Sequence, residues 1–104
     1  MLKKFLGAAL LTVALASTAL AEGKKTIGVS IPAADHGWTA GVVYHAERVA
    51  EQIRKEYPDA NVIVKTSPDP ASQANALQDL AVQGLDALVI LPTDPDPLVN
   101  AIKE

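Results

Sequence analysis

Three side chains in one short segment bring together groups that bind hydroxylated ligands. Asp35 is a hydrogen-bond acceptor, His36 donates or accepts, and Trp38, the only tryptophan of the chain, offers a large flat apolar face. Sugars need this mixture, because their hydroxyls take paired hydrogen bonds while the C–H faces of the ring pack on aromatic surfaces. The segment therefore predicts a ligand-binding loop with Asp35, His36 and Trp38 as contacts.

Each candidate also has a structural interpretation that the sequence leaves open. Trp38 suits the first core position of a helix, Asp35 suits a helix cap, and His36 suits a solvated or loop-bonding position. Asp94 is a fourth candidate contact, which the turn-forming residues around it also make a good helix cap.

The elements that must position these residues alternate between strand and helix patterns. Short β-branched runs bounded by Pro or Asp are typical of strands, and apolar residues spaced three and four apart are typical of one face of a helix. We expect strands at 26–31, 61–66 and 87–91, and helices at 38–57, at 71–83 and from 98 onward.

Local breakers and caps support these bounds. Asp69 and Pro70 predict a cap and a first helical residue, and Gly84 is a suitable stop for the same helix. The run 87–91 is apolar without alternation, which is typical of a strand covered on both faces. It therefore predicts that this strand is central in a parallel sheet.

The predicted order β-α-β-α-β-α indicates an α/β fold, a doubly wound parallel sheet with helices on both faces. In open sheets of this kind, ligands bind beyond the carboxyl ends of the strands. This rule selects three loops, at 32–37, 67–70 and 92–97.

Composition and missing motifs narrow the function. A formal net charge of −3 argues against nucleic acid as a partner, and the lack of cysteine excludes a disulfide, a thiolate metal site and a lipid-modified cysteine. The sequence contains no glycine-rich phosphate loop, no nucleophile elbow and no H-E-x-x-H motif. We therefore expect no enzyme activity, no cofactor and no metal.

Residues 1–21 have the pattern of a cleavable secretion signal. Lys3 and Lys4 precede an apolar run at 5–16, and Ala19-Leu20-Ala21 places small residues where a signal peptidase needs them. A membrane anchor is the alternative, but the run is shorter than the ~20 residues that span a bilayer. We expect cleavage before Glu22, release into the periplasm and no stable membrane insertion afterwards, with 22–104 forming the domain.

The segment 24–104 resembles the sugar-binding branch of the type I periplasmic binding proteins, the soluble receptors of ABC importers. The matching features are Lys25–Pro32, Trp38 opening a helix, Ser72-Gln73, and the segment Gln83–Asp94 that ends in a proline and an acidic residue. Two positions depart from the family pattern. Thr39 stands where a second aromatic is frequent, and Leu91 stands where sugar-binding members often have asparagine.

This resemblance implies a two-lobed protein that closes on a monosaccharide or similar small ligand and delivers it to an ABC permease. By position, His36 and Trp38 match the family's ligand contacts, with Asp35 beside them. The resemblance also implies that the 104 residues are a partial N-terminal lobe, without the hinge and the second lobe.

Three other functions remain open at this point. A periplasmic sensor or chemoreceptor-coupled binding protein for another small molecule has the same features. The same fold also forms the effector domain of repressors, which carry a helix-turn-helix where this chain has a signal sequence. A flavodoxin-like enzyme is the third alternative.

Overall fold

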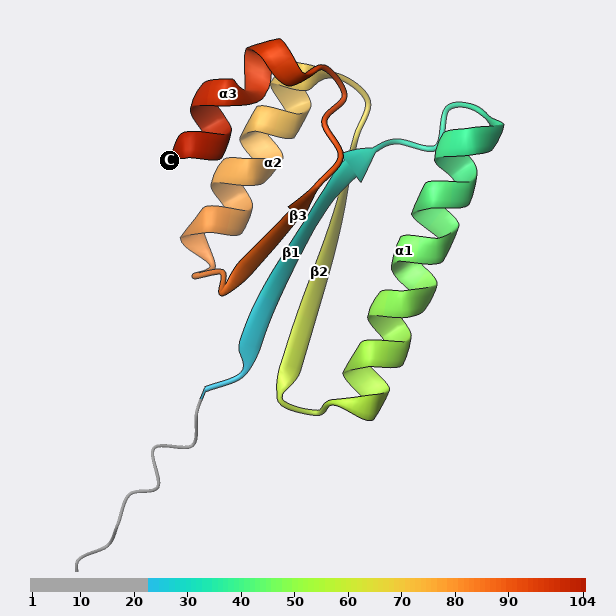
Figure 1. The fold of residues 1–104 in the computed structure, drawn as a ribbon, viewed down its shortest axis with the longest axis vertical. Coiled ribbons are helices and arrows are strands. Elements are labelled where there is room, and N and C mark those ends of the chain that lie inside the picture. Colours follow the sequence, from blue (N-terminus) through green and yellow to red (C-terminus); the bar gives the residue numbers. More distant parts are fainter. Residues whose placement is uncertain (1–22) are drawn as a thin grey trace, which may run out of the picture.

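The computed structural model describes residues 23–104, which form alternating strands and helices (Figure 1). The predicted signal sequence at 1–21 lies outside the described residues. The first five elements lie within one residue of their predicted bounds, whereas the last helix begins at Pro95 instead of Leu98. The elements are β1 (Lys25–Pro32), α1 (Gly37–Glu56), β2 (Ala60–Ser67), α2 (Pro70–Val82), β3 (Ala87–Ile90) and α3 (Pro95–Lys103).

The strands form a parallel sheet in the order β2-β1-β3. Ile27 of β1 is aligned with Val62 on one side and with Ala87 on the other. The prediction that the 87–91 strand is central is therefore wrong for the described residues, because β1 is central and β3 lies at an edge. An apolar run indicates that both faces of a strand are apolar. It does not indicate how many neighbouring strands pair with that strand.

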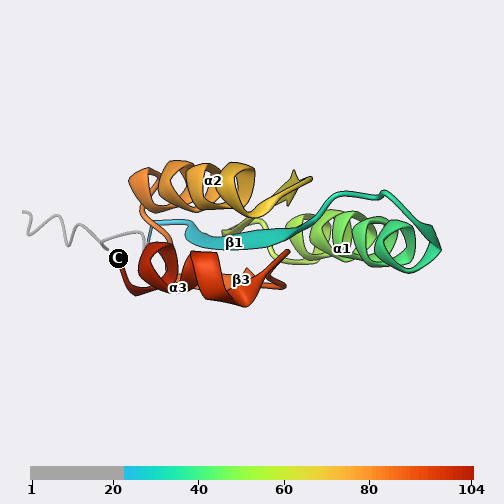
Figure 2. The same cartoon turned by 90° about the horizontal axis from the view of Figure 1, so that it is seen from above.

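Helices cover both faces of the sheet, as predicted for a doubly wound fold. In both views α1 lies on one side of the strands and α2 and α3 lie on the other (Figures 1 and 2). The side chains of β1 alternate accordingly. Ile27 and Val29 face Ala50 and Ile53 of α1, and the intervening Gly28 faces α2 and the loop after it.

The core lies between the sheet and these helices. Its buried apolar residues come from every layer, and Leu80 of α2 and Leu98 of α3 have no exposed surface. Leu98 brings the last helix against α2. Within residues 23–104, no helix combines the length and the apolar character that a membrane span requires.

Helix ends follow from local sequence chemistry. The Asp69 carboxylate accepts a hydrogen bond from Ser72 N at 2.7 Å, and Pro70 occupies the first helical position of α2. Gly84, two residues beyond α2, has φ +74°, a left-handed conformation that favours glycine. The caps predicted at Asp69 and the stop predicted at Gly84 are confirmed.

The direction of the crossovers determines where a cleft opens. The helix after β1 packs on one face of the sheet, whereas the helix after the adjacent β3 lies on the other side, where it packs on α2. The two loops therefore diverge above the carboxyl ends of neighbouring strands, which is where ligands bind in open α/β sheets.

Candidate functional site

A cleft of about 280 Å³ lies at the carboxyl ends of all three strands. This volume is just below the range of about 300–1,000 Å³ that is usual for small-molecule sites. The predicted convergence of the three loops is confirmed, since each contributes to the lining. The lining residues are Pro32, Ala33, Asp35, His36, Trp38, Thr39, Ser67, Pro68, Leu91, Pro92 and Thr93.

Backbone hydrogen bonds hold the cleft walls against the sheet. Ala33 N donates to Ser67 O at 2.8 Å and so ties the loop after β1 to the end of β2. On the other side, Leu91 N donates to Ser30 O at 2.9 Å, which extends the β1–β3 pairing beyond the last residue of β3. Both walls are therefore held in place where they leave the carboxyl ends of the strands.

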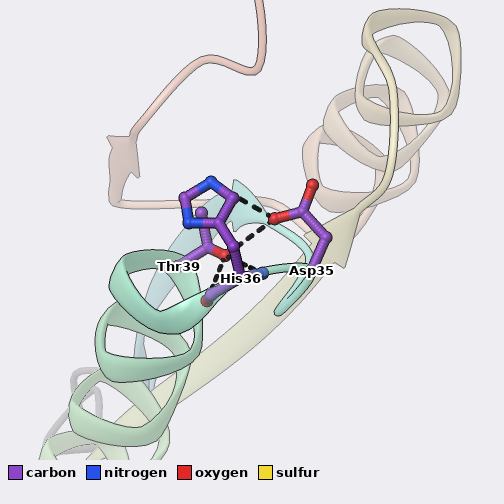
Figure 3. Close-up of polar contacts among 3 residues, drawn as sticks. All are labelled: Asp35, His36 and Thr39. Carbon is purple, nitrogen blue, oxygen red and sulfur yellow. Dashed lines mark hydrogen bonds and ion pairs between the residues drawn. The ribbon is translucent and has the colours of Figure 1, made fainter.

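The loop after β1 is organised around Thr39, in the first turn of α1 (Figure 3). The Thr39 hydroxyl lies 2.8 Å from Asp35 Oδ1 and 3.0 Å from His36 O, and it accepts a hydrogen bond from His36 N at 3.2 Å. Thr39 is 5% exposed, whereas Asp35 and His36 are open to solvent. A buried hydroxyl thus orients two exposed polar residues at the mouth of the cleft.

Asp35 is anionic at neutral pH. The hydrogen bond from Thr39 lowers the pKa of the Asp35 carboxyl below its ordinary value, and the neighbouring His36 acts in the same direction. The His36 Nε2 lies 3.5 Å from Asp35 Oδ1, so the two pair as ions when the imidazole is protonated. His36, rather than Asp35, is the N-cap residue of α1.

Trp38 does not pack in the core of the described residues. Its side chain is 62% exposed at the start of α1, and it contributes to the wall of the cleft. Of the two roles that the sequence left open for Trp38, the core role is therefore excluded for the described part of the chain. Its exposed side chain lines the same cleft as Asp35 and His36.

Asp94 has a clear structural role. It is the N-cap of α3, and its Oδ1 accepts a hydrogen bond from Asp96 N at 3.2 Å. It follows Thr93 directly in the chain but does not line the cleft. A ligand contact at Asp94 stays a prediction.

Two residues important for the cleft were not singled out from the sequence as site residues. Gln73 of α2 is fully buried and hydrogen-bonds to Thr93 N, which lies in the cleft wall. The Thr93 hydroxyl oxygen is itself buried without a hydrogen-bond partner among the described residues. The signal for Gln73 was its spacing, since it lies four and seven residues before the buried Leu77 and Leu80.

The described residues offer little for metal chemistry. Within 23–104, no group of three or more His, Asp or Glu side chains is arranged to hold a metal ion. The chemistry that the cleft does offer is one ionised carboxylate, one imidazole and one exposed indole, which together suit a polar ligand with an apolar face.

Comparison with known proteins gives a partial match. No protein-family model matches the chain. The chain is similar to the ribose import binding proteins RbsB of Salmonella typhimurium and Salmonella typhi, with 31% identity over 93 residues in each case. The match covers 88% of this chain but 30% of each relative, so the chain spans under a third of the length of these curated relatives. This similarity loosely supports the resemblance to sugar-binding proteins.

Proposed function

We propose that the chain is part of the N-terminal lobe of a periplasmic binding protein that carries a small neutral sugar to an ABC permease. The observation on which this proposal rests is the exposed indole of Trp38 beside the ionised Asp35, at the carboxyl end of a parallel sheet. The indole offers a flat apolar face that a sugar ring can cover, and the carboxylate beside it can bind the ring's hydroxyls.

The charge of the cleft favours a neutral ligand. Asp35 is anionic, and neither a lysine nor an arginine is among the lining residues. Among the described lining residues no lysine or arginine would offset the repulsion between Asp35 and an anionic ligand, while neutral hydroxyls donate to the carboxylate in charge-assisted hydrogen bonds. The names of the similar proteins, which describe ribose import, support a monosaccharide as the first ligand to test.

The residues outside the cleft complete the proposal. The pattern of 1–21 supports export through a cleavable signal, and the limited coverage of the relatives supports an assignment of 22–104 to one lobe of a larger architecture. The protein in this proposal binds and releases its ligand without chemical change.

Calorimetric titration of the full-length gene product with ribose and a panel of neutral monosaccharides tests the proposal. We expect saturable binding of at least one neutral sugar, and much weaker binding of the corresponding sugar phosphate. The Asp35→Asn variant keeps the shape of the side chain but removes its charge, and we expect about tenfold weaker binding because hydrogen bonds to charged groups are the stronger ones. A folded protein that binds none of these sugars contradicts the proposal.

A further inference from the structure

Gln73 connects three parts of the fold through one buried amide. Its Nε2 lies 3.1 Å from Ser30 Oγ in β1 and 3.0 Å from Leu91 O at the end of β3, and it donates to both. Its Oε1 accepts a hydrogen bond from Thr93 N at 2.7 Å. Gln73 and Ser30 have no exposed surface, and their mutual hydrogen bond is buried, while the contacts with Leu91 and Thr93 are partly buried.

The position of Gln73 is itself fixed. Its backbone N donates to Asp69 O at 3.0 Å, and Asp69 caps the same helix through its side chain. An amide has its donor and its acceptor on one carbon, so a side chain that satisfies both can adopt only one orientation. Gln73 therefore offers a rigid template for the chain that follows β3.

The wall segment Leu91–Thr93 needs such a template. Pro92 has no N–H, so after Leu91 the next backbone donor is Thr93 N. That donor goes to Gln73, and Leu91 and Thr93 both line the cleft while Gln73 does not. The geometry of this wall thus depends on a residue behind it.

We infer that Gln73 is a positioning residue, which sets the Leu91–Thr93 wall and thereby the ligand affinity of the cleft without touching the ligand. The part of this inference that concerns affinity rests on the proposed function, whereas the part that concerns the wall does not. Loss of the amide leaves the partly buried Thr93 N and Leu91 O without these hydrogen bonds, so the wall moves to find other partners.

Hydrogen exchange of the full-length protein tests the wall directly. In Gln73→Leu, which keeps the bulk and removes all three hydrogen bonds, we expect Thr93 N–H to exchange at least tenfold faster relative to Ile31 in β1. Leu77→Ala is the matched control. Leu77 lies one turn later on the same buried face, so its truncation lowers the stability of the fold without removing a polar contact to the wall. Here the Thr93-to-Ile31 ratio should stay within twofold of the wild type.

The Gln73→Glu variant gives a readout that a purely structural role would not change. An ionised carboxylate accepts from Thr93 N but repels Leu91 O, whereas a protonated carboxyl again has a donor and an acceptor. Burial raises the pKa of such a group, so it becomes protonated under mildly acidic conditions. The sugar affinity of the variant divided by that of the wild type should therefore rise as pH falls. This ratio removes the pH effects of the groups that both proteins share.

The outcomes separate the two proposals. We expect sugar binding to weaken at least tenfold in Gln73→Leu and less than twofold in folded Leu77→Ala. Unchanged Thr93 exchange in folded Gln73→Leu, or changed exchange with unchanged affinity, overturns the positioning role and leaves the proposed function intact. If the wild type binds no sugar, the proposed function fails, and Thr93 exchange alone decides whether Gln73 sets the wall. Should Gln73→Leu not fold, both quantities are measured against pH in Gln73→Glu: Thr93 exchange decides whether Gln73 sets the wall, and the affinity ratio decides its effect on the ligand.

Discussion

The Thr39 hydroxyl lies 2.8 Å from Oδ1 of Asp35, four residues earlier in the chain. Thr39 is buried and Asp35 is exposed, so the helix supplies a fixed group that orients a carboxylate on a loop. The sugar-binding proteins that the sequence resembles often have an aromatic residue at the position of Thr39. In this chain the position holds a hydrogen-bonding side chain, and the cleft keeps one aromatic residue, Trp38, in its lining.

The first prediction concerns the acidity of Asp35. We expect Thr39→Val to raise the pKa of Asp35 toward its ordinary value of 3.8, because the hydrogen bond from Thr39 is the largest cause of the lowered pKa. The chemical shift of the Asp35 carboxyl carbon, followed by ¹³C NMR as a function of pH, measures this pKa. An unchanged pKa in Thr39→Val would show that the hydroxyl does not hold this carboxylate.

The same interaction has a defined effect on stability. A carboxyl whose pKa is lower in the folded state stabilises the fold above the unfolded pKa, and this contribution disappears as pH falls through the folded pKa. The stability difference between the wild type and Asp35→Asn should therefore shrink on acidification below the ordinary value of 3.8. Urea unfolding at a series of pH values measures this difference, and one that grows as pH falls would contradict the assignment.

A second prediction compares two glycines, one in a left-handed conformation and one inside a helix. Gly84 has φ +74°, so Gly84→Ala should lower the free energy of unfolding by about 1–2 kcal/mol. Gly41 lies inside α1 with open space where a Cβ would be, so Gly41→Ala should raise stability by about 0.5–1 kcal/mol. Chemical denaturation of both variants tests the pair, and equal effects of the same sign would be inconsistent with these conformations.

A third prediction concerns the core. Leu80 has no exposed surface, so Leu80→Ala should cost about 2–5 kcal/mol of unfolding free energy. Val82, two residues later in the same helix, is 88% exposed, and Val82→Ala should change stability by about 0.5 kcal/mol or less. Thermal and urea unfolding give both values. A cost at Val82 that equals the cost at Leu80 would mean that the outer face of α2 is covered.

A fourth prediction concerns export. The small residues Ala19-Leu20-Ala21 predict cleavage after Ala21, so we expect N-terminal sequencing of periplasmic material to begin at Glu22. Replacing Ala21 by a large residue such as Phe should block processing, while the same change at Ala14 should not. A mature protein that keeps Met1 would contradict the signal sequence.

Features set by neighbouring residues could be predicted from the sequence. Asp69 and Pro70 start α2 through a side-chain cap and a fixed φ, and Gly84 follows the helix in a left-handed conformation. Both depend on chemistry within a few residues, which the sequence displays directly. The convergence of three loops was also predictable, since it follows from the βα alternation.

Features set by distant residues were harder to predict. The edge position of β3 depends on which side of β1 the second crossover returns to, and the apolar run at 87–91 carries no information on this. Gln73 meets Thr93 twenty residues later in the chain, so its role depends on the tertiary fold. Trp38 had two possible roles because its helical spacing fits a core position. The packing of α1 excludes the core role within the described residues, and the ligand role stays a prediction.

The most direct test of a sugar site built around Trp38 is calorimetric titration of the full-length protein and its Trp38→Ala variant, with a melting curve for each. Trp38 is 62% exposed, so its truncation should leave the melting temperature nearly unchanged, whereas affinity should fall at least tenfold. Trp38→Phe should lose less, because it keeps an aromatic face and stacking contributes about 0.5–1.5 kcal/mol beyond burial. Tyr57→Ala is the matched control, since Tyr57 is 57% exposed at the opposite end of α1. Its affinity should equal that of the wild type, and unchanged affinity in a folded Trp38→Ala protein would contradict the account.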